Sequence, residues 1–286
     1  MASIRLLRGR IKSVKNIAQI TKAMEMVAAS KMKKAQAAAL AGKLYAEKIF
    51  TMVMELGAKS DVSHHPLMGR PKTMTGKRLV ILLSTNKGLC GSLNTNLFRF
   101  FLESYPKLDV NDYMTYGRKG AAFLSRMNAP VQLDFSESPQ LSFVAALTDT
   151  VTEKFTKGMY DGVDIIYSDF INSLIQKPKK KTILPLTLEN LPAEHMPHFG
   201  EFLIEPTTAE VFSELLPHYL ENQIRDAVLE SEASEHSARM VAMRNATDSA
   251  LTLIDELTLL FNKVRQEKIT YEISDMVTAR LAVEEA

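Results

Sequence analysis

The placement of proline is the feature that most constrains how this chain folds. All eleven prolines lie between Pro66 and Pro217, which leaves the first 65 and the last 69 residues of the 286-residue chain without one. A proline inside a helix costs about 3 kcal/mol, so ends without proline are compatible with long continuous helices. At 1.5 Å per residue each end would extend roughly 80–100 Å, which suits a shaft or a spacer better than a compact enzyme.

Apolar spacing supports a helix at each end. The three-four spacing of a helical stripe is seen in two sets of residues, Ile4, Leu7, Ile11, Val14, Ala18, Ile17, Ile20, Met24 and Val27 near the start, and Met240, Met243, Leu251, Ile254, Leu257, Phe261 and Val264 near the end. We predict an N-terminal coiled-coil helix over 1–59 and a C-terminal one over 207–286. A capping box, Thr207 to Glu210, opens the second helix, and Pro217 is expected to kink or break its first turns.

Charge is distributed unevenly between the two ends. Residues 1–48 carry eleven Lys and Arg but two acids, whereas residues 218–286 carry thirteen Asp and Glu but seven Lys and Arg. Opposite charges beside an apolar stripe favour pairing of helices. The favoured interpretation is a long antiparallel coiled coil, and the alternative is two solvated faces that never meet.

The middle of the chain predicts an α/β domain. Strands are expected at 78–84, 112–116, 163–167, 182–186 and 202–204, helices at 94–105, 118–127 and 139–156, a linker at 60–76 and a basic turn at 177–181. This alternation is typical of a mostly parallel sheet covered by helices. We therefore expect a Rossmann-like domain over 77–205, inserted between the two helices.

Motifs that carry chemistry are weak in this sequence. The turn Gly88–Gly91 follows a strand, where anions bind, but it lacks the Gly-Lys-Ser/Thr ending of a nucleotide P-loop, so a structural turn is favoured. Cys90 is the only cysteine, and the six histidines are scattered. We expect no catalytic residue, no metal site and no cofactor. The basic first helix is compatible with nucleic acid, but the acidic second helix explains its charge equally well.

Several segments resemble the gamma subunit of F-type (rotary) ATP synthases of the bacterial type. These segments are Ser13–Asn16, Gln19–Met24, Met26–Lys31, Lys87–Gly91 with Asn94, Tyr167–Phe170, Gln176, Pro178, Leu184-Pro185, Ala238–Met240, Ala242-Met243, Ala246–Asp248, Asn262, Arg265-Gln266, Ile269-Thr270 and Glu272. The chain departs from the family at Asn86, where an acid is common, and at Ser92, where glycine is common. Its tail also carries Arg280 and two terminal glutamates in place of a small Gly-Ala stretch.

The resemblance implies a non-catalytic rotor. The paired helices would form the central stalk inside a head of alpha and beta subunits, and the Rossmann-like domain would lie near the epsilon subunit and the membrane-embedded c-subunit ring. Coupling and partner binding would rest on Met24, Arg265, Gln266, Thr270 and Glu272.

The same resemblance places the chain at the cytoplasmic face of a bacterial inner membrane, which it would touch only through the complex. A basic, amphipathic start is also typical of a mitochondrial presequence, but the pattern continues past Ser30 without a cleavage-like site. Two other functions stay open at this point: a coiled-coil scaffold that binds nucleic acid, and an independent nucleotide-binding enzyme.

Overall fold

The computed structural model describes residues 4–59, 65–69, 75–138, 141–186 and 204–284. Its contacts divide the chain into two compact units, residues 29–239 and residues 1–28 together with 240–286. Two long helices, α1 (Ile4–Lys59) and α5 (Thr208–Glu284), each contribute to both units. Within the described residues, no helix is apolar over enough of its length to cross a membrane.

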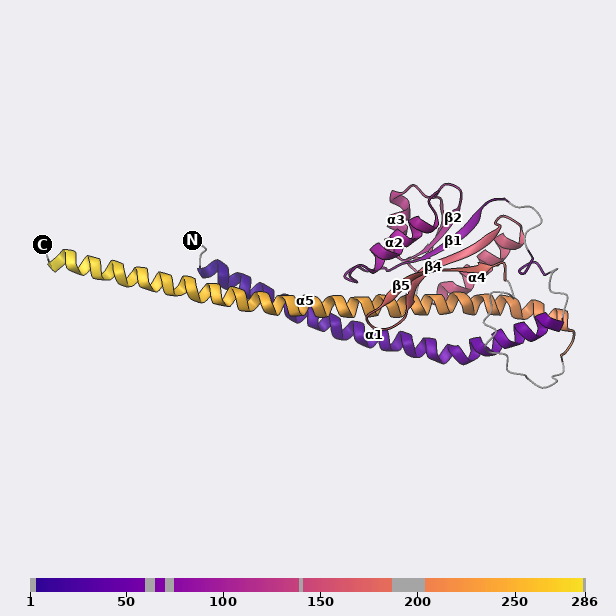
Figure 1. Cartoon of the computed structure of the whole chain (residues 1–286), viewed down its shortest axis with the longest axis horizontal. Coiled ribbons are helices and arrows are strands. Elements are labelled where there is room, and N and C mark those ends of the chain that lie inside the picture. The colour runs from indigo at the N-terminus through magenta and orange to yellow at the C-terminus, as the bar shows by residue number, and fades with distance from the viewer. Residues whose placement is uncertain (1–3, 60–64, 70–74, 139–140, 187–203, 285–286) are drawn as a thin grey trace. The chain divides into compact units, whose positions relative to one another are not determined.

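The unit of residues 29–239 contains a five-stranded sheet (Figure 1). Its elements are β1 (Arg78–Leu83), α2 (Leu93–Ser104), β2 (Asp112–Tyr116), α3 (Arg118–Arg126), β3 (Val131–Asp134), α4 (Ser142–Thr156), β4 (Gly162–Phe170) and β5 (Gln176–Leu184). The strand order is β3-β2-β1-β4-β5, and β5 alone runs antiparallel to its neighbour. The expected fold, a mostly parallel sheet between helices, is confirmed.

The two faces of the sheet are covered by different helices because side chains alternate along a strand. On β1, Val80 and Leu82 pack with α2 and α3, whereas Leu79, Ile81 and Leu83 pack with α4 and with parts of α1 and α5. This second cluster includes three residues of α1 and seven of α5, namely Ile49, Val53, Leu56, Phe212, Leu216, Tyr219, Leu220, Ile224, Ala227 and Val228. The first part of α5 is therefore built into the core of this unit.

Several local predictions differ from the structure. The basic segment 177–181 lies in β5 and forms no turn, because its lysines alternate along an edge strand whose partner β4 is buried. Pro217 does not break α5, which begins nine residues earlier at Thr208 and continues through it. The short strand β3 was not expected, since all four of its side chains are exposed and give no apolar alternation. Of the strand expected at 202–204, residues 202 and 203 lie outside the described part of the chain, and Ile204 is in no strand.

The second unit pairs the start of α1 with the later part of α5. The Arg8 guanidinium lies 5.7 Å from the centre of the Phe261 ring, and the hydroxyls of Thr21 and Thr247 are 2.7 Å apart. The earlier of these two residues on α1 contacts the later of the two on α5. The two helices therefore pair in antiparallel orientation. On α1 the first part of the predicted stripe is covered: Leu7 and Ala18 are buried, and Ile4, Ile11 and Val14 are half-buried. The predicted antiparallel coiled coil is confirmed here.

Candidate functional site

The loop after β1 directs main-chain oxygen atoms at a buried arginine of α5. Nη2 of Arg239 donates to the carbonyl oxygens of Lys87 (3.1 Å) and Gly88 (3.2 Å), and its Nε donates to Gly88 at 3.2 Å. The same guanidinium pairs with Glu235 at 2.8 Å. A loop that binds phosphate offers N–H groups to an anion, whereas this loop offers carbonyl oxygens to a cation. The geometry agrees with a structural turn at 88–91 and opposes an anion site there.

Hydrogen bonds from a nearby side chain stabilise the turn at 88–91. Leu89 and Gly91 both have a positive φ, 63° and 59°, a conformation that costs a leucine of order 1 kcal/mol or more. The Asn94 side chain closes the turn, because its Nδ2 donates to Thr85 Oγ1 at 2.7 Å and to Cys90 Sγ at 3.4 Å. Burial raises the pKa of the Cys90 thiol, which keeps it protonated and unreactive.

Asn86 accounts for one departure from the family pattern. Its Oδ1 accepts a hydrogen bond from the main-chain N–H of Arg118, the first residue of α3, at 3.0 Å. An amide oxygen satisfies a free N–H at a helix start as an acid would. Asn86 therefore satisfies the first main-chain N–H of α3.

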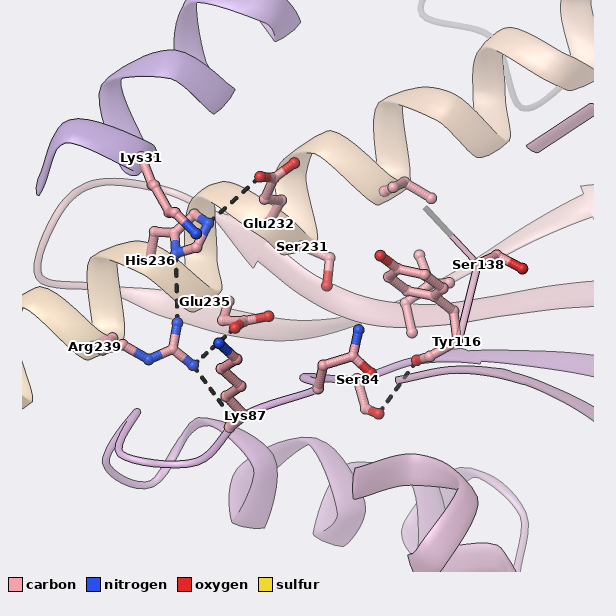
Figure 2. A pocket seen from close by; sticks show the side chains of 13 residues that line it. Lys31, Ser84, Lys87, Tyr116, Ser138, Ser231, Glu232, Glu235, His236 and Arg239 are labelled. Carbon is pink, nitrogen blue, oxygen red and sulfur yellow. Dashed lines mark hydrogen bonds and ion pairs between the residues drawn. The ribbon is translucent and has the colours of Figure 1, made fainter. Parts of the chain in front are cut away.

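A cavity of about 270 Å³ lies beside this loop, between the carboxyl ends of β1 and β2 and one face of α5 (Figure 2). Ligands bind at this edge in many doubly wound sheets. Here the charged groups of α5 pair with each other: His236 Nε2 lies 3.4 Å from Glu232, and its Nδ1 lies 3.4 Å from Arg239 Nη1. Among the described residues, no group of three or more His, Cys, Asp or Glu is placed to hold a metal ion. The polar groups at this edge hold α5 against the sheet.

The residues that the resemblance indicates on the second helix lie in the other unit, exposed on α5. Arg265, Gln266, Thr270 and Glu272 are all exposed to solvent. The Thr270 hydroxyl donates to the main-chain oxygen of Gln266 at 3.0 Å, and Glu272 pairs with Lys268 at 3.3 Å. Their polar ends are thus free to meet another protein, apart from these local contacts.

Met24 is separate from that group. It is half-buried on α1, one turn beyond the Thr21–Thr247 contact, so it lies near residue 244 of α5. At 1.5 Å per residue this is about 30 Å along the helix from Arg265. The five residues therefore lie on two separate surfaces. Met24 lies on α1, and the other four lie together on the exposed end of α5.

Large exposed apolar side chains surround both surfaces. On α1 of this unit they are Leu6, Ile17, Ile20, Met26 and Val27, and on α5 they are Leu251, Leu253, Leu259, Leu260, Ile269, Tyr271, Ile273, Met276, Val277, Leu281 and Val283. Ile17, Ile20 and Val27, which the sequence pattern assigned to the continuing stripe, thus face solvent. A surface with this much exposed apolar area is typical of an interaction site.

Arg239 and Ser237 fasten α5 to loops of the sheet, and neither was predicted to do so. Ser237 is fully buried, and its hydroxyl donates to the main-chain oxygen of Ser173 at 2.7 Å. Arg239 lies in the segment Ala238–Met240, which resembles the family, but that resemblance assigned it no contact. Their partners are main-chain oxygens of distant loops, which a sequence pattern does not reveal.

Comparison with known proteins agrees with the motifs at both ends of the chain. A family model described as ATP synthase matches residues 3–283. The ATP synthase gamma chains of Opitutus terrae and Dehalococcoides mccartyi are each 42% identical, over 99% of this chain and 99% and 100% of theirs.

Solved structures agree with the fold. A chain of the Euglena gracilis mitochondrial ATP synthase (OSCP/F1/c-ring) matches with a TM-score of 0.67 at 20% identity, covering 98% of this chain and 94% of that one. A chain of the central stalk and c-ring of the Tetrahymena thermophila mitochondrial enzyme matches with a TM-score of 0.59 at 25% identity, covering 79% and 99%. With a family match over nearly its full length and relatives above 40% identity, this chain belongs to the ATP synthase gamma chain family.

Proposed function

We propose that the chain is the central-stalk rotor subunit of a proton-driven ATP synthase. In this role it couples rotation of the membrane ring to conformational cycling of the catalytic subunits. The single observation that carries the proposal is the end of α5: from Arg265 on, every side chain that the structure describes is exposed. The full-length family match supports the same assignment.

The end of α5 is apolar over much of its circumference. At about 100° per residue, Ile269, Ile273, Met276 and Leu281 cover one broad face, while Tyr271 lies on the opposite side. These five side chains are between 46% and 72% exposed. A helix with one flat docking face would bury a narrow stripe, whereas this distribution fits a partner that surrounds the helix. A sleeve formed by the alpha and beta subunits has that shape.

The polar residues on this segment suit contact with a catalytic subunit. Arg265 offers a planar fork of donors that fits a carboxylate, and Gln266 beside it both donates and accepts. Thr270 and Glu272 extend the polar surface by one to two turns. Met24, with the exposed Ile20 and Val27 near it on α1, would provide a second, mainly apolar contact with the head.

The remaining roles follow from the family. The rotor itself would carry no catalytic residue and bind no cofactor, metal or nucleic acid. The loop after β1 supports this, because it directs carbonyl oxygens at Arg239 and does not present N–H groups to an anion. We propose a coiled coil of 1–59 with 207–286 and a Rossmann-like domain of 77–205, whose partners are the epsilon subunit and the c-subunit ring. Its place would be the cytoplasmic face of a bacterial inner membrane, reached through the complex.

Co-purification tests this function. A tagged copy expressed in its host should bring down alpha and beta subunits in about threefold excess over itself, and vesicles carrying the complex should pump protons on adding ATP. Recovery of the tagged chain without alpha and beta subunits would contradict the proposal. Saturable binding of ATP by the purified chain would favour an independent nucleotide-binding protein instead.

A further inference from the structure

The hairpin of β4 and β5 rests on α5 through a partly buried ionic cluster. Glu230 of α5 is half-buried, and its Oε2 is buried without a hydrogen-bond partner among the described residues. The groups that face it are Tyr167 and Asp169 from β4 and Lys179 and Lys181 from β5. Lys179 Nζ pairs with Asp169 Oδ2 at 3.2 Å, so one of the two lysines is already engaged by a carboxylate.

Acidic groups surround the position of Glu230. One turn before it, the Asp226 carboxylate interacts with the same Lys181 and with Arg225, whose side chain is exposed. Lys179 already pairs with Asp169, and the Asp169 carboxylate itself faces Glu230. An ionised carboxylate oxygen that is buried without a donor is costly. A proton on Glu230 Oε2 removes that cost.

We propose that this cluster is a proton-binding site, in which Glu230 takes up a proton when the β4–β5 hairpin lies on α5. The hairpin then grips the stalk helix more tightly in its protonated form. Ser237 provides a second attachment that needs no proton, through Ser173 O at 2.7 Å and Gln176 Nε2 at 3.3 Å. The hairpin therefore stays in place at high pH but opens more often.

The direction of the pH effect follows from burial. Desolvation raises the pKa of Glu230, although the Tyr167 hydroxyl opposes the shift, and desolvation also raises the pKa of Asp226 and lowers that of Lys181. A carboxyl whose pKa is higher in the docked state binds its proton more tightly there. Docking is then strongest at low pH and weakens as pH rises through the docked pKa, above the ordinary glutamate value of about 4.3.

Hydrogen exchange of the full-length chain tests the proposal. Amides of the β4–β5 hairpin are followed from pH 5 to 8.5, corrected for intrinsic exchange rates and normalised to β1. Protection in the hairpin should fall with rising pH by up to about tenfold per unit, the limit for one proton. Glu230→Gln, which is neutral and of the same size, should keep the low-pH level of protection throughout. Glu214→Gln, at an exposed position of α5, should respond to pH as the native chain does.

Two results would overturn the proposal: hairpin protection in the native chain that does not vary with pH, or the native pH dependence persisting in Glu230→Gln. Should that variant fail to fold, carboxyl ¹³C shifts of labelled glutamate in the native chain decide the question. A Glu230 pKa at or below about 4.3 would then refute it, and a pKa clearly above that value would support it.

Discussion

The two ends of α5 are parts of one helix but depend on different partners. Between Phe212 and Val228 the helix places seven residues in the core of the sheet unit, and Leu216, Leu220 and Ile224 have no exposed surface. From Arg265 to Val283 the described side chains are all exposed, including seven large apolar ones. Local helix propensity does not explain the difference, because the buried region is helical even though it contains Pro217. The difference lies in what covers the apolar side chains.

That difference assigns a separate role to each region. The first is stabilised by its own chain, so substitutions there should act on the free energy of unfolding. In the second, every described side chain is exposed, and an apolar surface of this kind is typical of a site that meets a partner. Substitutions at the end of α5 should therefore leave unfolding unchanged and alter function in the assembled complex.

The largest effect is expected in the sheet unit, at the buried carboxylate of β4. Asp164 is fully buried and accepts hydrogen bonds from Arg78 (2.6 and 2.7 Å), from Thr182 (2.7 Å) and from Tyr105. Asp164→Ala leaves the Arg78 guanidinium without its partner and should cost about 3–5 kcal/mol of unfolding free energy. Denaturant unfolding measures it, and a loss below 1 kcal/mol would contradict the role given to this network.

The same carboxylate predicts a pH dependence. Burial opposes ionisation of Asp164, but the hydrogen bonds from Arg78, Thr182 and Tyr105 outweigh it, so its pKa is lowered. An acid with a lowered folded pKa stabilises the fold above its unfolded value, about 3.9, and this contribution is lost as pH falls through the folded pKa. Unfolding free energy of the native chain should fall below about pH 4 more steeply than that of Asp164→Asn. Equal slopes would exclude this linkage.

A matched pair of leucines compares the buried region of α5 with an exposed position six residues before its second region. Leu220 is fully buried, whereas Leu259 is 72% exposed. Leu220→Ala should destabilise the chain by about 2–5 kcal/mol, because it removes buried methyl groups and leaves a cavity. Leu259→Ala should change stability by no more than about 0.5 kcal/mol. Thermal unfolding of the two variants measures the contrast, and similar losses would show that the later part of α5 is covered by its own chain.

The polar pair at the end of α5 should affect only the assembled enzyme. Replacing both Arg265 and Gln266 with Ala removes hydrogen bonds to a charged partner, each of which contributes about 1.5–3 kcal/mol. Turnover should fall roughly 10- to 100-fold if these contacts act at a limiting step, while assembly persists. Lys263→Ala, also exposed on α5, is the control. Normal ATP synthesis by an assembled double variant would exclude this pair from the contact.

Met24 should give the smallest effect, since it is already half-buried against its own chain. Met24→Lys places an unpaired cation at a moving contact, at a cost on the order of 1 kcal/mol, and should modestly lower the number of protons pumped per ATP hydrolysed. Inverted membrane vesicles measure this ratio. Ala23→Lys, at the neighbouring exposed position, separates the site from a general effect of charge. Unchanged coupling in Met24→Lys would remove Met24 from the contact.

Sequence patterns predicted the long helices and most of the sheet because apolar periodicity records burial directly. The stripe of Leu7, Val14 and Ala18 on α1 and the strand around Leu79–Leu83 follow from it. The exposed strand β3 was missed, and the lysine-rich first part of β5 was taken for a turn, because edge strands bury few side chains. The contacts of Arg239 and Glu230 could not be predicted, since their partners are brought together only by the fold. The coupling residues came from family resemblance and remain a prediction.

Hydrogen exchange at the end of α5 tests the central claim most directly, since that claim is that other subunits surround this segment. Amides of residues 265–284 are compared in the free chain and in the purified ATP synthase complex, with residues 216–228 as an internal reference. The account predicts that 265–284 exchange rapidly in the free chain and become strongly protected on assembly, while the reference changes little. Exchange of 265–284 that is equally rapid in the complex would contradict it.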